Sequence, residues 1–126
     1  VMDKWFALQA TRPDENVLEI VQALMDHPSF NFNNPNRLRS LVGSFANHNL
    51  KAFNHISGSG YRFLTDVLIR LNETNPQVAA RLIEPLIRFS RFDAQRQTLM
   101  KRALERLSAV EDLSKDLFEK IEKALQ

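Results

Sequence analysis

Two arginines and a glutamine are the residues of this chain whose types and spacing best suit binding chemistry. Gln77 and Arg81 stand four positions apart, so on a helix they lie together on one face. Arg39 and Arg81 each follow an Asn-Pro pair by a few residues, close to where a helix is expected to begin. The free N–H groups of such an end favour anionic or carbonyl-bearing partners, and a guanidinium can hold a carboxylate or peptide carbonyl in its planar fork. Considered alone, either arginine more often forms a surface or interdomain salt bridge.

Residues suited to catalysis or metal binding are scattered. The three histidines, His27, His48 and His55, fall near expected helix ends or loops, and no two have the spacing of zinc ligands on a helix. We interpret them as solvent-exposed or capping residues. The segment Gly58-Ser59-Gly60 lacks the context of a nucleophile elbow or a phosphate loop, so we interpret it as a linker. The sequence predicts no catalytic residue and no metal or cofactor ligand within the chain.

Composition indicates one globular domain over residues 1–126. The chain is 44% hydrophobic and 25% charged, which is typical of a folded protein. It has no cysteine, which excludes disulfides and suits a reducing cytoplasm. The net charge is only +2 and the basic residues are mixed with acids, a pattern typical of solvated helix faces and not of a nucleic-acid surface. No apolar run is long enough to span a bilayer, so a membrane partner is not predicted.

The hydrophobic pattern predicts an all-α fold. Apolar residues recur at helical spacing along the whole chain, and no segment alternates as a strand does. We expect about seven or eight helices, stacked as antiparallel pairs. A short helical turn is expected over 51–53, and the other helices are expected to start near Val1, Thr11, Asn34, Ser59 or Gly60, Asn75, Asp93 and Ser114.

The helix that carries Gln77 and Arg81 has the clearest signals. Asn75 is a suitable cap, and Pro76 suits the first helical position, where its missing N–H is no loss. Pro85 should bend the helix or end its regular part. The residues of its expected apolar stripe are Val78, Leu82, Ile83, Leu86 and Ile87.

A weak internal repeat suggests how the helices stack. A shift of 41 positions places Asn34-Pro35 on Asn75-Pro76 and Leu41-Val42 on Leu82-Ile83. A period of about 40 residues is typical of the helix pairs of armadillo and HEAT arrays. We therefore expect an α-solenoid of stacked pairs, forming a curved superhelical bowl.

Five segments, in order along the chain, together resemble a known family. They are 1–10 (VMDKWFALQA), 34–41 (NPNRLRSL), 58–61 (GSGY), 75–87 (NPQVAARLIEPLI) and 113–121 (LSKDLFEKI). The chain resembles the C-terminal helical domain of bacterial aminopeptidase N, a zinc aminopeptidase of the gluzincin type. The resemblance covers the whole length of the chain but concerns a non-catalytic part of the family.

The resemblance implies a function for the chain as part of a larger enzyme. The zinc, its ligands and the general base would lie in an upstream catalytic domain of the same cytoplasmic bacterial polypeptide. This domain would cover the catalytic site, control access, and contact the peptide substrate through Arg39, Gln77 and Arg81. Arg37 has a weaker claim and is expected to face outward or toward another domain.

Two further readings follow from the same residues. Met2, Trp5 and Phe6 lie on a helix that starts without a cap, and we expect them to form an apolar patch that packs against an upstream domain. The other phenylalanines are expected mostly in the core. A free-standing α-solenoid that binds a partner peptide is the alternative function, and an independent enzyme is a third possibility that lacks a recognisable constellation of residues.

Overall fold

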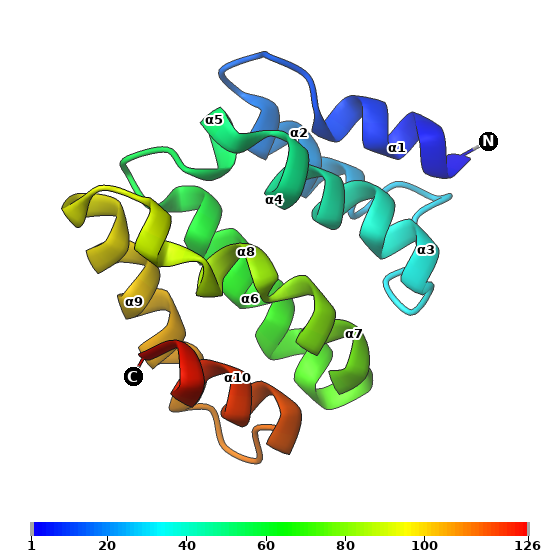
Figure 1. Cartoon of the computed structure of the whole chain (residues 1–126). Helices are drawn as coiled ribbons and strands as arrows, with labels where there is room; N and C mark the ends of the chain where they lie inside the picture. Colours follow the sequence, from blue (N-terminus) through cyan, green and yellow to red (C-terminus); the bar gives the residue numbers. More distant parts are fainter. Residues whose placement is uncertain (1, 126) are drawn as a thin grey trace. The chain divides into compact units, whose positions relative to one another are not determined.

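All regular structure in the computed structural model is helical across residues 2–125, the part of the chain that it describes (Figure 1). The all-α prediction is therefore confirmed. The elements are α1 (Met2–Ala10), α2 (Val17–Leu24), α3 (Pro35–Leu38), the π-helix η1 (Arg39–Gly43), α4 (Ser44–His48), α5 (Leu50–Phe53), α6 (Ser59–Thr74), α7 (Pro76–Leu82), α8 (Glu84–Ile87), the 3-10 helix η2 (Phe89–Arg91), α9 (Ala94–Ser108) and α10 (Lys115–Leu125).

Several of these helices begin where their sequences predict. The side-chain oxygen of Asn34 accepts hydrogen bonds from the N–H groups of Asn36 and Arg37, and that of Asn75 accepts one from Val78. Asp93 caps α9, and the Ser114 hydroxyl accepts a bond from the Leu117 N–H at the start of α10. Each of these caps satisfies N–H groups that the helix itself leaves without a partner.

Two helix starts differ from their predictions. The second helix begins at Val17 and not within 11–15, because Pro13 and Asp14 lie in an irregular segment and Glu15 and Asn16 form the turn that leads into the helix. The longest helix begins at Ser59 after Gly58, whose left-handed φ of 78° makes the turn. Ser59 and Gly60 are therefore helical, and the interpretation of 58–60 as a linker is wrong.

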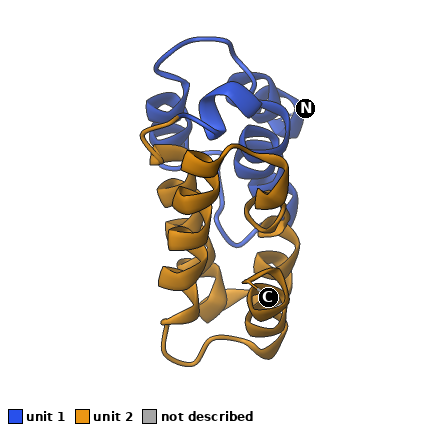
Figure 2. Ribbon diagram, turned by 60° about the vertical axis from the view of Figure 1, so that its left-hand side comes forward, with its two compact units in different colours: residues 1–55 blue, residues 56–126 orange. Residues whose placement is uncertain are grey.

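The chain divides into two compact units, residues 1–55 and 56–126 (Figure 2). In the first unit, α1 packs against η1 and α2, and the rings of Phe45 and Phe53 meet edge to face at 6.0 Å. In the second unit, α6 packs against α7 and α9, and α10 packs against α7, α8 and α9. Each unit has a core of its own, with Phe6 and Phe45 fully buried in the first and Leu64 and Leu104 in the second. Burying each such large apolar side chain contributes about 1.5–3 kcal/mol. The prediction of one domain over 1–126 stays a prediction.

The first helix corrects the expected apolar patch. Trp5 is 37% exposed and Leu8 58%, whereas Phe6 is fully buried. The Phe6 ring packs edge to face against the rings of His27 and Phe30, at 5.7 Å from each. Phe6 therefore belongs to the core of the first unit and not to an exposed patch.

Most phenylalanines are buried or half-buried as expected, but Phe118 is not. It is 48% exposed on α10, whereas its neighbours Leu117 and Ile121 are fully buried. One position along a helix turns the side chain by about 100°, enough to move it from the buried stripe to solvent. The expectation that Phe118 faces inward is wrong.

Candidate functional site

Gln77 and Arg81 lie together on α7, as their spacing predicts. Asn75 starts this helix with its cap, and Val78, Ala79 and Leu82 bury its opposite face. Gln77 and Arg81 are exposed. Neither side chain forms a hydrogen bond or ion pair with any other residue in 2–125, so both remain available to a ligand.

These two side chains line a pocket of about 570 Å³ between α7 and α10. The wall from α10 carries two acids and two lysines, so the pocket presents both signs of charge. A guanidinium and an amide on one side suit carboxylates and peptide carbonyls, whereas the acids suit peptide N–H groups or an ammonium. The lining residues are Gln77, Ala80, Arg81, Asp116, Glu119, Lys120 and Lys123.

Lys120 holds the two walls of this pocket together. Its Nζ donates to the Ala80 carbonyl at 2.6 Å and to Glu84 Oε1 at 2.9 Å, so one ammonium ties α10 to both α7 and α8. The two acceptors lie on either side of the break between α7 and α8. Pro85 lies in the first turn of α8 and ends the regular part of the preceding helix, as its sequence position predicts.

The four charged residues on α10 were not predicted as part of the site. In the sequence their charges are interleaved, a pattern that indicates only a solvated helix face. Nothing local in a sequence specifies that this face lies beside α7, because that placement depends on long-range packing. The exposed Asp116, between the cap Ser114 and the buried Leu117, is indistinguishable from an ordinary first-turn acid.

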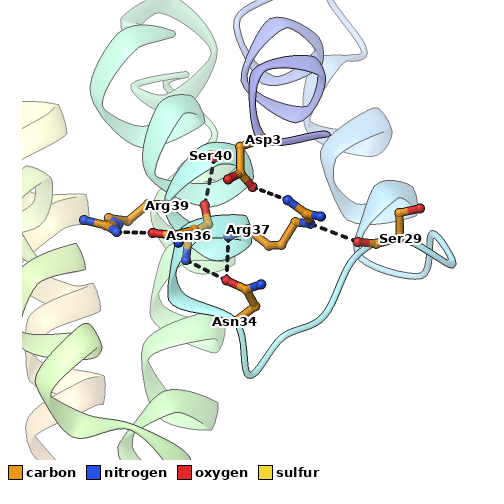
Figure 3. A network of polar contacts seen from close by, with 7 residues as sticks. All are labelled: Asp3, Ser29, Asn34, Asn36, Arg37, Arg39 and Ser40. Atoms are coloured by element: carbon orange, nitrogen blue, oxygen red, sulfur yellow. Dashed lines mark hydrogen bonds and ion pairs between the residues drawn. The ribbon is translucent and has the colours of Figure 1, made fainter. Parts of the chain in front are cut away.

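Arg39 belongs to the first compact unit, whereas Gln77 and Arg81 belong to the second. It lies at the start of η1, and its Nη2 donates to Asn36 Oδ1 (Figure 3). The Asn36 carbonyl in turn accepts a bond from the Ser40 hydroxyl at 2.8 Å. This pairing leaves most of the guanidinium donors of the exposed Arg39 unused.

Arg37 has an internal role, which corrects the expectation that it faces outward or toward another domain. Its Nη1 lies 2.6 Å from Asp3 Oδ1, and its Nε donates to the Ser29 carbonyl at 3.2 Å (Figure 3). The side chain thereby joins α1 to α3 and to the loop before α3. Figure 3 shows Arg37 and Arg39 reaching to opposite sides of their helix, as their separation by two positions requires.

The three histidines do not line the pocket between α7 and α10. His48 and His55 are exposed, while half-buried His27 accepts a hydrogen bond from the Ser29 N–H through Nδ1 and packs beside Trp5.

In the second unit, burial raises the pKa of Tyr61 to about 12, against a smaller opposing effect of Arg96. Within residues 2–125, no group of three or more His, Cys, Asp or Glu side chains is arranged to hold a metal ion. No helix in the same range has both the length and the apolar character needed to cross a membrane.

A fold that is all-helical over residues 2–125, with stacked helices and a polar pocket between α7 and α10, belongs to the class of helical-repeat domains. The chain belongs to the domain family of unknown function DUF3458_C, described as ARM repeats, whose model matches residues 1–126. This match agrees with the predicted armadillo-like α-solenoid.

The individual proteins that the chain is similar to are aminopeptidases. The chain is 93% identical over its whole length to aminopeptidase N of Haemophilus influenzae, and 61% identical over 99% of its length to that of Escherichia coli. It spans 14% of the length of each of these relatives. A crystal structure of Legionella pneumophila aminopeptidase A in complex with aspartic acid superposes with a TM-score of 0.91 at 32% identity, covering 98% of this chain and 14% of the other. The resemblance to the C-terminal helical domain of aminopeptidase N is thereby confirmed.

Proposed function

We propose that this chain is the substrate-access and peptide-contact domain of a zinc aminopeptidase that removes N-terminal residues from peptides. The observation that carries the proposal is the pair of Gln77 and Arg81, exposed at a pocket with no partners among the described residues. Polar side chains held ready on a rigid helix suit the recognition of a peptide main chain. The identity with aminopeptidase N of Haemophilus influenzae supports a peptidase as the parent.

The catalytic zinc of the proposed parent would be bound outside this chain. The described residues provide no set of metal ligands, so the chain's own part is to bind and orient substrate. Covering the catalytic site would limit entry to peptides and unfolded ends, which achieves specificity by exclusion. A cytoplasmic location in bacteria is part of the same proposal, because the relatives it matches are bacterial proteins.

Within this proposal, Gln77 and Arg81 hold the main chain or the terminal carboxylate of the peptide downstream of the cleaved bond. Arg39 contributes a further contact through its unused donors. A substrate with a single residue and a chromogenic amide lacks the part of the peptide that these side chains would bind. The two kinds of substrate therefore separate a contact with the peptide from a general effect on catalysis.

The test replaces Arg81 with alanine in the full-length parent enzyme. We expect KM for a short peptide to rise by about tenfold, the effect of one lost charge-assisted bond, with little change for an alanine chromogenic amide. Arg88→Ala is the matched control, because Arg88 is also exposed in the second unit but does not line the pocket. Equal effects of Arg81→Ala on both substrates would contradict the proposed contact.

A further inference from the structure

A second pocket, unrelated to the Gln77 and Arg81 site, lies between the start of α6 and the middle of α9. Its volume is about 230 Å³, and it shares no lining residue with the pocket between α7 and α10. Its floor is apolar, made by Leu99, Ala103 and the buried ring of Tyr61. Its rim is cationic, with Arg62 from α6 and Arg102 and Arg106 from α9.

The rim carries an excess of positive charge. Arg106 forms an ion pair with Asp66, and Arg62 Nη1 donates to the Ser57 carbonyl at 2.9 Å, which leaves the charge of Arg62 unbalanced. Arg102 makes no hydrogen bond or ion pair with any residue in the part of the chain that is described. None of the described residues that line the pocket carries a carboxylate. Beside Tyr61, Asp93 and Arg96 pair with each other at 2.8 Å, so these two charges offset each other.

The backbone before α6 fixes one of these guanidinium groups in place. A Cβ atom added at Gly58 would lie 3.4 Å from Arg62 Nη1 and 3.3 Å from Leu99 Cδ2, so the bare glycine allows both side chains to pack closely against the turn. With Arg62 held by Ser57 and Arg106 held by Asp66, two cations are oriented before any ligand arrives. Such orientation reduces the entropy cost of binding.

We propose that this pocket binds the phosphate group of a small phosphate monoester. A phosphate monoester near pH 7 carries a mean charge of about −1.5 to −2 and three acceptor oxygens, which suits guanidinium groups approaching from two helices. A planar carboxylate is satisfied by a single guanidinium fork, so three arginines exceed what it requires. The apolar floor suits the short organic part of a monoester. This site is independent of the proposed peptide contacts.

The experiment titrates the full-length parent polypeptide with inorganic phosphate and, separately, with glycerol phosphate, following the phosphorus NMR line width. Chloride keeps the ionic strength constant, because salt screens such contacts. The variants are Arg102→Gln and Arg62→Gln, which remove one rim charge each. Arg91→Gln is the control, since it removes the same charge from an exposed arginine of the second unit outside the pocket. Melting temperatures verify that each variant is folded.

We expect saturable binding that weakens by about tenfold in both rim variants and stays unchanged in Arg91→Gln. Tighter binding of glycerol phosphate than of phosphate would identify an organic phosphate as the ligand, and equal binding would identify phosphate itself. Identical titrations of the parent and the rim variants would overturn the proposal. A lack of saturable binding would also overturn the proposal. If binding were absent and Arg102→Gln had a lowered melting temperature, this would indicate that a carboxylate of the parent occupies the pocket.

Discussion

At the scale of single residues, the pair of Asp93 and Arg96 shows how a cap and a charge act together. The Arg96 side chain and its backbone N–H both bond to the Asp93 carboxylate, and they hold the pKa of that carboxyl below its ordinary value. A carboxyl whose pKa is lowered by folding stabilises the protein above its unfolded pKa. This contribution is lost as the pH falls through the folded pKa.

Replacing Asp93 with asparagine tests this coupling. Asparagine is also a good N-cap, so the hydrogen bond to the Arg96 N–H is retained and only the charge is lost. We expect the variant of the 126-residue chain to melt slightly below the original near pH 7, and the two melting temperatures to converge as the pH falls below the ordinary pKa of an aspartate. A difference in melting temperature that does not depend on pH would contradict the role of the charge.

Residue-scale features are also those that sequence reasoning predicted best. The caps Asn34, Asn75 and Asp93 were predictable because a cap depends on a few neighbouring residues. The common face of Gln77 and Arg81 followed from helical spacing alone. The bond from Arg37 to Asp3 was not predictable, because it joins residues far apart in the sequence.

At the scale of elements, one cation connects α10 to two neighbouring helices. Lys120 donates to Ala80 on α7 and pairs with Glu84 on α8. The neighbouring Lys123 lines the same pocket without a bond or ion pair to any other described residue. The two lysines therefore form a matched pair, one with a structural role and the other without.

Replacing Lys120 with methionine should lower the free energy of unfolding by about 1 kcal/mol, since both of its bonds are partly exposed. Methionine keeps the length and most of the apolar stem, so the loss reports the ammonium contacts. Lys123→Met should change the stability much less. Urea unfolding followed by circular dichroism measures both variants. Equal losses would mean that the Lys120 bonds contribute nothing specific.

Element boundaries show where prediction from sequence stops. A single helix was expected to start near Asn34, and the structure contains α3, η1 and α4 in direct succession. The π turn of η1 depends on how α1 packs against it, which the local sequence does not specify. Similarly, Pro13 is equally suited to a turn and to a first helical position, and only the packing of Val17 decides between them.

At the scale of the whole molecule, the chain matches a small share of much longer relatives. It spans 14% of the aminopeptidase N sequences that it matches. In the proposed function, the rest of the parent enzyme carries out catalysis, and this chain controls the access of substrate. Such a division of labour makes a clear prediction about what each part does alone.

The prediction compares three proteins with an alanine amide substrate and added zinc: this chain, the parent, and the parent without this chain. We expect no turnover by the isolated chain, activity in the parent, and reduced activity or selectivity in the truncated parent. Turnover by the isolated chain would overturn the proposal. A truncated parent with full activity and selectivity would favour an interaction module that binds a partner peptide.

The two Asn-Pro caps also bear on the chemical ageing of the protein. Asparagine usually deamidates when the backbone nitrogen of the next residue attacks its side-chain carbonyl and closes a cyclic imide. After Asn34 and Asn75 that nitrogen belongs to Pro35 and Pro76, whose ring leaves it without a hydrogen to lose. The proline at the first position of each helix thus also blocks deamidation of the asparagine cap by this route.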